Sequence, residues 1–443
     1  MKTRLINLWD AFRGGFLFIP TIFVAFAVTL AIVVPQLDDR FAAQILAYSP
    51  GVRMQPDTAR STLSSIAGAI ITVTGVVFSI TVVALSIASS QFGSRLLRIF
   101  MNDQVTQMTI GYLVGSSVYC FLLLSIIQSN VGLDGVPHAA VQLGIVGGIS
   151  SFAVMIYFIH HVAKSIHVTT IVNVLGDDLD ASIMRLFPAN HDDPAEDVSS
   201  PPQHDDEQRE NTQDVTIHAD REGYIQGIDM DTVTSIAKSN RLIVRLRHRP
   251  GNFLVRDAPL ADVSASEEVT EDDIRELNDA IIVGSRRTPR QDVECAVHEL
   301  VEVAVRALSP GINDPFTANS CIDRLGAALS RLARRRMLPP ERYDGDGYLR
   351  VVVPAVTFPD VVDAAFHQIR QNSTNQVSVV VRLLENFALV VQFTDSEQDT
   401  DAIVRHAHLV RDGAKAEHPH PEDAETIDER FTRVLEAAGI EQE

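Results

Sequence analysis

Residues 61–94 read STLSSIAGAIITVTGVVFSITVVALSIASSQFGS and contain no Asp, Glu, Lys or Arg. Three further stretches, residues 14–37, 104–133 and 135–163, share this property. A helix needs about 20 apolar residues to cross the roughly 30 Å hydrocarbon layer of a bilayer. Backbone polar groups cannot stay unpaired in lipid, so each stretch is expected to be a helix. The sequence therefore predicts four membrane spans, near residues 16–34, 63–90, 105–127 and 139–163, and excludes a fully soluble protein.

The Lys and Arg residues that flank the spans predict their orientation. Cytoplasmic flanks of membrane helices are usually the richer in Lys and Arg. If the N-terminus lies inside, six basic residues flank the inner ends and three flank the outer ends: Lys2, Arg4, Arg13, Arg95, Arg98 and Lys164 against Arg40, Arg53 and Arg60. This bias predicts that both termini are cytoplasmic. The first span is longer than a signal-peptide core and is expected to be retained as an anchor.

The composition excludes other classes of protein. A net charge of −20 argues against nucleic acid as a partner, because nucleic-acid binding needs a basic surface. The cysteines are Cys120, Cys295 and Cys321, an odd number with one inside an apolar stretch, so no disulfide framework is predicted. A reducing compartment is the better expectation.

Beyond the spans, composition divides the chain further. A helical exit from the membrane is expected to complete a transmembrane domain at residues 1–187. Residues 188–214 are strongly acidic and almost without apolar side chains, which predicts a disordered linker. Residue patterns predict a small β-rich subdomain at 215–265, a mainly helical one at 266–416, and an acidic tail with a terminal helix at 417–443. The expected fold class is an α-helical polytopic membrane domain followed by a mixed α+β, mainly helical, cytoplasmic domain.

The second span carries small residues on one helical face. They follow one another at steps of four, three or seven: Gly68, Thr72, Gly75, Ser79, Ser86 and Gly93. Small residues let another backbone approach closely. The partner is another helix of the same subunit, or the same helix in other copies around a mildly polar conduit, or another subunit without a conduit. No Asp, Glu, Lys or Arg lies at mid-membrane in any span, which argues against a proton-coupled pump.

Two basic clusters are expected at the membrane surface. Arg95 and Arg98 lie one turn apart after the second span, in a segment that predicts an interfacial helix in contact with lipid. His160 and Lys164 share a face at the end of the fourth span, where interfacial anchoring is the expected role. A metal at His160 is disfavoured, because the adjacent His161 points the other way on a helix and no carboxylate joins them.

The motif RRTPRQD, residues 286–292, precedes a long amphipathic pattern. Thr288 at the N-cap, Pro289 at the first helical position and Gln291 at the third predict a capping box. The polar face of the helix that follows is expected to be solvated and salt-bridged.

The motif ALSPGINDPFTA, residues 307–318, ends that helix and starts another. Pro-Gly supplies a turn, Asn313 or Asp314 caps the next helix, and Pro315 opens it. Local structure thus explains most of both motifs. Because helix N-termini attract anions, a small anionic ligand or a subunit contact is the alternative, and we expect the two motifs to meet in space. The residues assigned to this site are Arg287, Thr288, Gln291, Asp292, Asn313 and Asp314.

A run of arginines lies on one side of a predicted strand: Arg241, Arg245, Arg247 and Arg249. Pairing with neighbouring carboxylates is their expected role. An anionic ligand or a lipid headgroup is the alternative.

Several segments together resemble a family of predicted bacterial membrane proteins catalogued as a domain of unknown function. They are SSQFGSRLLRIFMNDQVTQMTIGYLVG (89–115), FIHHVAKSIHV (158–168), GYIQGIDMD (223–231), RPGNFLV (249–255), RRTPRQD and ALSPGINDPFTA. The resemblance extends from about residue 8 to about residue 415. It implies an inner-membrane location and a cytoplasmic C-terminal region, but no activity and no residue roles.

Two functions from different classes are therefore expected. The first is an oligomeric bacterial inner-membrane protein, with a channel or conduit around the second span that the cytoplasmic domain assembles or gates. A homo-oligomer is the default for such proteins. The alternative is a non-conducting scaffold or sensor whose cytoplasmic domain binds a ligand or a protein partner. An enzyme is disfavoured, since the sequence has no Gly-rich phosphate loop, no HExxH and no nucleophile elbow, and we expect no catalytic residue, cofactor or metal.

Overall fold

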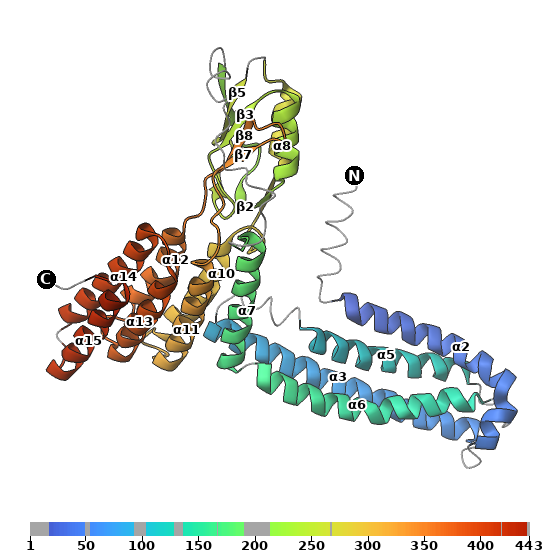
Figure 1. Ribbon diagram of the computed structural model, residues 1–443. Coiled ribbons are helices and arrows are strands. Elements are labelled where there is room, and N and C mark those ends of the chain that lie inside the picture. Colours follow the sequence, from blue (N-terminus) through green and yellow to red (C-terminus); the bar gives the residue numbers. More distant parts are fainter. Residues whose placement is uncertain are drawn as a thin grey trace. The chain divides into compact units, whose positions relative to one another are not determined.

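The apolar stretches form helices in the computed structural model, which describes residues 17–48, 54–92, 103–127, 136–165, 167–189, 213–265, 268–417 and 419–440. The chain divides into two compact units, Met1–Thr170 and Ile171–Glu443. The helices of the first unit are α2 (Phe18–Tyr48), α3 (Pro56–Phe92), α5 (Gln104–Ile126) and α6 (His138–Ser165) (Figure 1).

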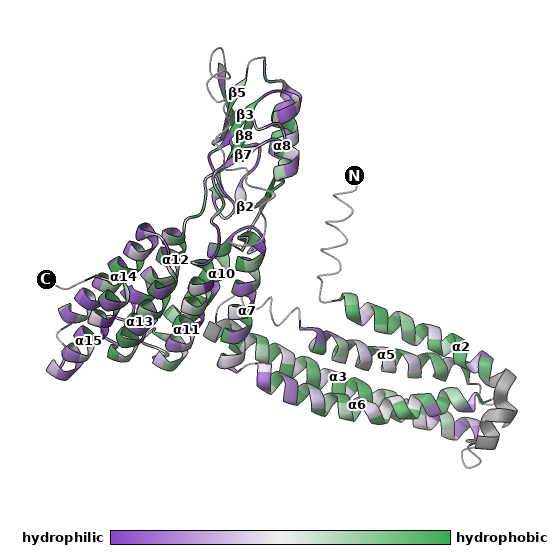
Figure 2. Cartoon of the chain, viewed as in Figure 1, coloured by the Kyte–Doolittle hydropathy of each residue, from purple (hydrophilic) through white to green (hydrophobic). Residues whose placement is uncertain are grey.

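Each of these helices contains a segment long and apolar enough to cross a membrane: Phe18–Leu37, Pro56–Ile87, Gln104–Ile126 and His138–Ser165. Figure 2 shows hydrophobic residues along all four, whereas the helices near the C-terminus are mixed in character. The predicted four-span membrane region is confirmed.

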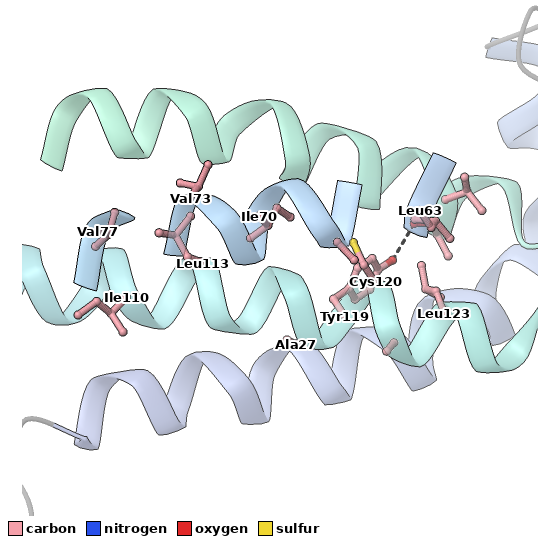
Figure 3. Packing of buried hydrophobic residues seen from close by; sticks show 14 of the residues in the cluster. Ala27, Leu63, Ile70, Val73, Val77, Ile110, Leu113, Tyr119, Cys120 and Leu123 are labelled. Atoms are coloured by element: carbon pink, nitrogen blue, oxygen red, sulfur yellow. Dashed lines mark hydrogen bonds between the residues drawn. The ribbon is translucent and has the colours of Figure 1, made fainter. Parts of the chain in front are cut away.

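Helix α5 packs against the other three helices of the membrane unit. Leu113 and Leu123 of α5 are fully buried, and Leu63 and Ile70 of α3 are buried with them (Figure 3). Tyr119 of α5 donates a hydrogen bond from its hydroxyl to the carbonyl of Ala140 in α6 at 2.9 Å, so the one polar atom of this buried ring is satisfied.

Close contact between helices of one chain rests on glycines of α5 and α6. A β-carbon added at Gly115 of α5 would lie 3.1 Å from the carbonyl oxygen of Phe23 in α2. One added at Gly148 of α6 would lie 2.6 Å from the side chain of Ile66 in α3. These glycines allow the helix backbones to approach each other as small residues do in membrane proteins generally.

The second unit contains two β-sheets. The five-stranded sheet has the order β1-β5-β3-β8-β7, and the three-stranded sheet has the order β4-β2-β6. Strand pairs are antiparallel except for β3 and β8, which run parallel and pair Val244 with Val351. The strands are β1 (Gln213–His218), β2 (Gly223–Ile228), β3 (Ile243–Leu246), β4 (Phe253–Leu254), β5 (Pro259–Ala265), β6 (Ile281–Gly284), β7 (Glu341–Tyr343) and β8 (Leu349–Val352).

Two helices accompany the sheets, α8 (Met230–Ser239) and α9 (Glu271–Ala280). Their apolar side chains share one core with the strands, in which Val233, Val244, Val263 and Val351 are fully buried. Strands β6, β7 and β8 come from outside residues 215–265, because a strand pairs with whichever segment reaches its edge, whatever their separation in sequence.

The remaining helices pack together in the same unit (Figure 1). They are α7 (Val168–Leu186), α10 (Val293–Ala307), α11 (Pro315–Leu332), α12 (Phe358–Gln371), α13 (Val377–Val390), α14 (Glu397–Ala416) and α15 (Pro421–Ala437), with a short 3-10 turn η4 (Val391–Phe393). Residues 377–393, whose sequence is compatible with helix or strand, are helical. The terminal helix α15 packs on α13 and α14. A mixed, mainly helical second region is thus confirmed, while the predicted linker at residues 190–212 lies outside the described residues.

Candidate functional site

The small side chains of α3 point away from the core of their own chain. Gly68, Thr72, Gly75, Ser79 and Ser86, termed here the small-residue face, are all exposed. The opposite face carries Ile70, Val73 and Val77, which pack toward α5 (Figure 3).

Space beside this face is open. A β-carbon added at Gly68 or Gly75 would meet no described heavy atom within 4 Å, in contrast to the glycines of α5 and α6. The interpretation that these residues pack α3 inside one subunit is therefore wrong. The core-facing side of α3 is built from Ala, Leu, Ile and Val instead, and the small residues are left for lipid or for another molecule.

The small-residue face is bordered by large apolar side chains and is only weakly polar. Ile71, Val76 and Phe78 are 48%, 44% and 44% exposed. The Thr72 hydroxyl donates to the carbonyl of Gly68 at 2.9 Å, so its polarity is partly spent on its own helix. A shallow strip of small residues between larger apolar ones suits a second helix as well as a narrow conduit.

A separate pocket of about 300 Å³ lies in the membrane unit between α2, α5 and α6. Its wall includes Phe23, Tyr119 and Gly147, and it is mostly apolar. Tyr112 and Ser150 hydrogen-bond to each other at its edge. Because no residue of α3 lines it, this pocket is not part of the small-residue face.

The expected lipid-contacting residues are only partly described. Arg95 and Arg98 lie outside the described residues. His160 and Lys164 are exposed at the end of α6, as interfacial anchoring requires. Sequence reasoning missed their neighbour His161, whose Nε2 lies 3.0 Å from Asp103 Oδ2 at the start of α5. The statement that no carboxylate joins these histidines is wrong, because helix packing brings α5 and α6 together at this end.

In the second unit, the RRTPRQD motif is fastened to strand β2. Gln291 hydrogen-bonds the backbone of Ile228 twice: its Oε1 accepts from the amide at 2.9 Å and its Nε2 donates to the carbonyl at 3.2 Å. Gln226 in turn donates to the carbonyl of Arg286 at 2.8 Å. Both glutamines thus replace the strand partner that this stretch of chain lacks.

Helix α10 begins four residues later than predicted. Its N-cap is Asp292, which accepts from the Cys295 amide at 3.1 Å, and its first residue is Val293. Thr288 only reaches the carbonyl of Gln226, at 3.4 Å. The predicted capping box at Thr288 is therefore wrong. Gln291 is already committed to β2, which keeps residues 288–291 out of the helix.

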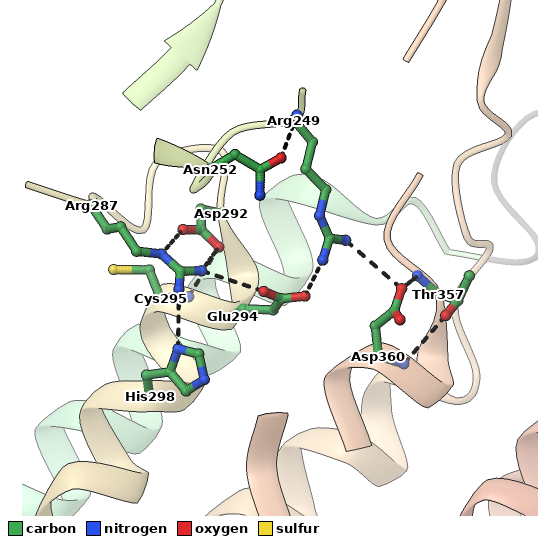
Figure 4. A network of polar contacts seen from close by, with 9 residues as sticks. All are labelled: Arg249, Asn252, Arg287, Asp292, Glu294, Cys295, His298, Thr357 and Asp360. Carbon is green, nitrogen blue, oxygen red and sulfur yellow. Dashed lines mark hydrogen bonds and ion pairs between the residues drawn. The ribbon is translucent and has the colours of Figure 1, made fainter. Parts of the chain in front are cut away.

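Arg287 is surrounded by the first turns of α10 (Figure 4). Its Nε lies 2.7 Å from Asp292 Oδ2, its Nη2 is 2.9 Å from Asp292 Oδ1 and 3.4 Å from Glu294 Oε2, and its Nη1 is 3.3 Å from His298 Nδ1. Burial disfavours the charge on the guanidinium, but the hydrogen bonds and ion pair with Asp292 outweigh it and raise the pKa of Arg287. Every nitrogen of this guanidinium already has a partner, so the geometry favours a structural role over anion binding.

Arg249 of the RPGNFLV motif joins the same network (Figure 4). Its Nη2 donates to Glu294 of α10, and its Nη1 lies 3.8 Å from Asp360 Oδ2 at the start of α12. Asn252 holds the turn by accepting from the Arg249 amide at 3.0 Å. Arg247, farther along the chain, pairs with Asp262 at 2.8 Å. For these two arginines, the expected pairing with carboxylates is confirmed.

The ALSPGINDPFTA motif lies at the other end of α10. Asp314 caps α11 by accepting from the Thr317 amide at 3.1 Å, and Pro315 opens the helix, as predicted. Asn313 is exposed and accepts from Gln376 Nε2 at 3.0 Å. The 15 residues of α10 separate this corner from Arg287, a rise of about 22 Å. The expectation that the two motifs meet within one chain is wrong.

Four candidate membrane spans followed by a mixed, mainly helical region define a polytopic membrane protein. The chain belongs to the family of predicted membrane proteins DUF2254, which it matches over residues 13–388. It is similar to Uncharacterized protein Mb1321c of Mycobacterium bovis and Uncharacterized protein Rv1290c of Mycobacterium tuberculosis, each 28% identical over 398 residues that make up 87% of this chain and 74% of the relative. No solved structure matches. The family resemblance of the sequence is confirmed.

Proposed function

We propose that this membrane protein is an oligomer of the bacterial inner membrane, with both termini in the cytoplasm, in which α3 of neighbouring copies surrounds a conduit. The second unit assembles or gates that conduit and performs no catalysis. The observation that carries the proposal is the open space beside Gly68 and Gly75 on a face that its own chain leaves exposed.

The physical argument is one of packing. Lipid tails are as apolar as the side chains they touch, so membrane helices associate by close contact of backbones, which small residues permit. Within this chain, the glycines of α5 and α6 already serve that purpose. The small-residue face of α3 repeats the same chemistry on the outside, and a second copy of α3 is its natural complement in a symmetric oligomer.

A second exposed surface supports assembly through the cytoplasmic unit. Ile312 and Phe316, on either side of the α11 cap, are 45% and 81% exposed. An aromatic ring left this open is unusual unless it contacts another molecule. We assign these two residues to a contact between subunits, in place of the anion site that Arg287 does not support.

The alternative function is a non-conducting scaffold or sensor. It is favoured by the Thr72 hydroxyl, which turns to its own helix, and by the apolar residues that border the small-residue face. In this case the α3 contact is dry and the second unit binds a ligand or a protein partner.

Cysteine cross-linking tests the α3 contact. The native cysteines are all buried, so an introduced cysteine reacts against a low background. Ser79→Cys is expected to give disulfide-linked dimers in membranes. Ile156→Cys, on an outward position of α6 that is 66% exposed, is the matched control and is expected to stay monomeric. Equal cross-linking at the two positions, or none at Ser79, would refute the assembly proposed here.

Flux through reconstituted protein then separates conduit from scaffold. In a wet pore, Ser79→Asp keeps its carboxylate hydrated and changes ion preference. In a dry contact, the same change costs roughly 2–4 kcal/mol and prevents assembly. An oligomer that passes no ions or small solutes under voltage, tension or osmotic shift identifies the scaffold.

A further inference from the structure

Three side chains that commonly bind metals meet between two helices of the second unit. Asp363 and His367 lie four positions apart on α12, which places them on one helical face. His406 reaches them from α14. One ligand atom from each residue lies within 4.8 Å of the other two.

The distances suit a small tetrahedral site. His406 Nε2 is 2.8 Å and His367 Nε2 is 3.4 Å from the same oxygen, Asp363 Oδ1. The two imidazole centroids are 4.7 Å apart. With Zn–N and Zn–O bonds near 2.0–2.2 Å, the ligand atoms of a tetrahedral zinc ion are about 3.3 Å from one another. Shifts of a few tenths of an ångström therefore make room for the ion.

His406 is prepared for coordination by its surroundings. Its side chain is fully buried, beside the rings of Phe366 and Phe387. Burial lowers its pKa to about 4, against the hydrogen bond to Asp363, so the imidazole is neutral at pH 7 and a metal displaces no proton from a charged ring. Its Nδ1 is buried without a hydrogen-bond partner. A half-satisfied buried imidazole calls for a functional explanation.

Asp363 supplies the negative charge. Burial alone would raise the pKa of this carboxyl, but the hydrogen bonds from His406 and Arg405 outweigh burial and lower it. Asp363 and His367 are each 37% exposed, so an ion can enter from solvent and a water can fill a fourth position. Two imidazoles, one carboxylate and a water form a coordination sphere typical of zinc sites with an open position.

One cation already competes for the carboxylate. Arg405 donates to Asp363 Oδ1, and Arg370 lies 3.4 Å from His367 Nδ1. Arg405 is 46% exposed, so its guanidinium can turn to solvent when a metal arrives. Its removal should therefore strengthen metal binding, an outcome that a purely structural Asp363–His406 pair does not predict.

We propose that Asp363, His367 and His406 form a binding site for a divalent first-row transition metal, with Zn²⁺ as the best fit. The bound ion links α12 to α14 in the part of the chain farthest from the membrane spans in sequence. The site goes beyond the proposed assembly and does not depend on it, and it revises the expectation from sequence that no metal binds.

The test is metal titration of the full-length protein, purified in detergent and stripped with a chelator. We expect one Co²⁺ per chain with the visible absorption of a tetrahedral site, displaced by Zn²⁺, and a rise in melting temperature with Zn²⁺ because the ion binds the folded state. His367→Ala should weaken binding by at least about tenfold, and Arg405→Gln should strengthen it. His367 is partly exposed, so its variant is expected to fold.

The matched control is His408→Ala, on the same helix but against Phe431 instead of the cluster. It should bind Co²⁺ as the wild type does. The proposal fails if the stripped protein takes up no stoichiometric metal at micromolar concentration, or if His367→Ala binds as tightly as His408→Ala. Weaker binding by Arg405→Gln would also contradict the site as drawn, since it would make Arg405 a supporting residue and not a competitor.

Discussion

Arg287 and Asp292 face each other through two hydrogen bonds, of 2.7 and 2.9 Å, while the same carboxylate caps helix α10. Asp292 is only 4% exposed, and Arg287 is 19% exposed. The arginine neutralises a buried charge that the helix start requires. The RRTPRQD motif is thus a structural corner in which the last residue starts the helix and the second residue makes that start affordable in a buried position.

The first prediction concerns this corner. Asp292→Ala removes the cap and leaves Arg287 without its main partner, so the free energy of unfolding should fall by about 3 kcal/mol or more. Thr288→Ala should cost less than about 1 kcal/mol, because Thr288 makes one long hydrogen bond and caps no helix. Denaturant unfolding of the two variants in the same detergent measures both values. A larger loss for Thr288→Ala would restore the capping box at that residue.

The second prediction concerns Gly251 in the RPGNFLV turn. Its φ of +95° lies in the left-handed region, and an added β-carbon would be 2.4 Å from Asp292 Oδ2. Gly251→Ala should therefore lower the free energy of unfolding by roughly 1–3 kcal/mol from backbone strain alone, with more from the displaced carboxylate. Gly311→Ala, where an added β-carbon meets no described atom within 4 Å, is the control and should stay within about 0.5 kcal/mol of wild type. Equal melting temperatures for the two variants would contradict this account.

The membrane spans could be predicted because the signal for them is local. An uncharged run of sufficient length is enough to identify a span, and no knowledge of the partner helix is needed. Which face of α3 is buried could not be read in the same way. Gly68 and Ile70 are both compatible with lipid and with protein, and only the positions of α5 and α6 decide that Ile70 is inside.

The start of α10 shows a different limit. Thr288 and Asp292 are both good caps by residue type, so local chemistry allows two helix starts. The choice between them depends on Gln291, whose partner Ile228 is 63 residues away. The metal cluster was missed for the same reason. Asp363 and His367 show helical spacing, but His406 is 43 residues from Asp363 and joins it only through the packing of α12 on α14.

The third prediction concerns the exposed corner of the second unit. Phe316→Ser removes a ring that is 81% exposed, so the stability of the single chain should change by no more than about 0.5 kcal/mol. If Phe316 contacts a neighbouring subunit, the oligomer should dissociate at higher protein concentration than the wild type does. Light scattering coupled to size-exclusion chromatography in detergent measures this. Leu389→Ser, at a position 58% exposed on α13, is the control. An oligomer that survives Phe316→Ser and fails with Leu389→Ser would move the subunit contact to α13.

The last prediction concerns acid stability without metal. In the unfolded chain the pKa of His406 is about 6.5, whereas burial lowers it to about 4 in the folded protein. The unfolded state therefore binds the extra proton first, so the stabilising contribution is complete above pH 6.5 and is lost as the pH falls toward 4. The groups that face the ring are Asp363 and His367 of α12 and its neighbour Arg405, while α13 contributes Phe387.

Between pH 7.5 and pH 5, this difference should lower the free energy of unfolding by about 2 kcal/mol. Asp363 does not contribute in that range, since its pKa lies below 3.8 in the folded state. Denaturant unfolding of the chelator-treated protein at the two pH values measures the loss, and His406→Leu should show a loss smaller by that amount. His408→Leu, which leaves the cluster intact, should keep the wild-type dependence. If His406→Leu loses as much stability as the wild type on acidification, His406 is not the group that titrates.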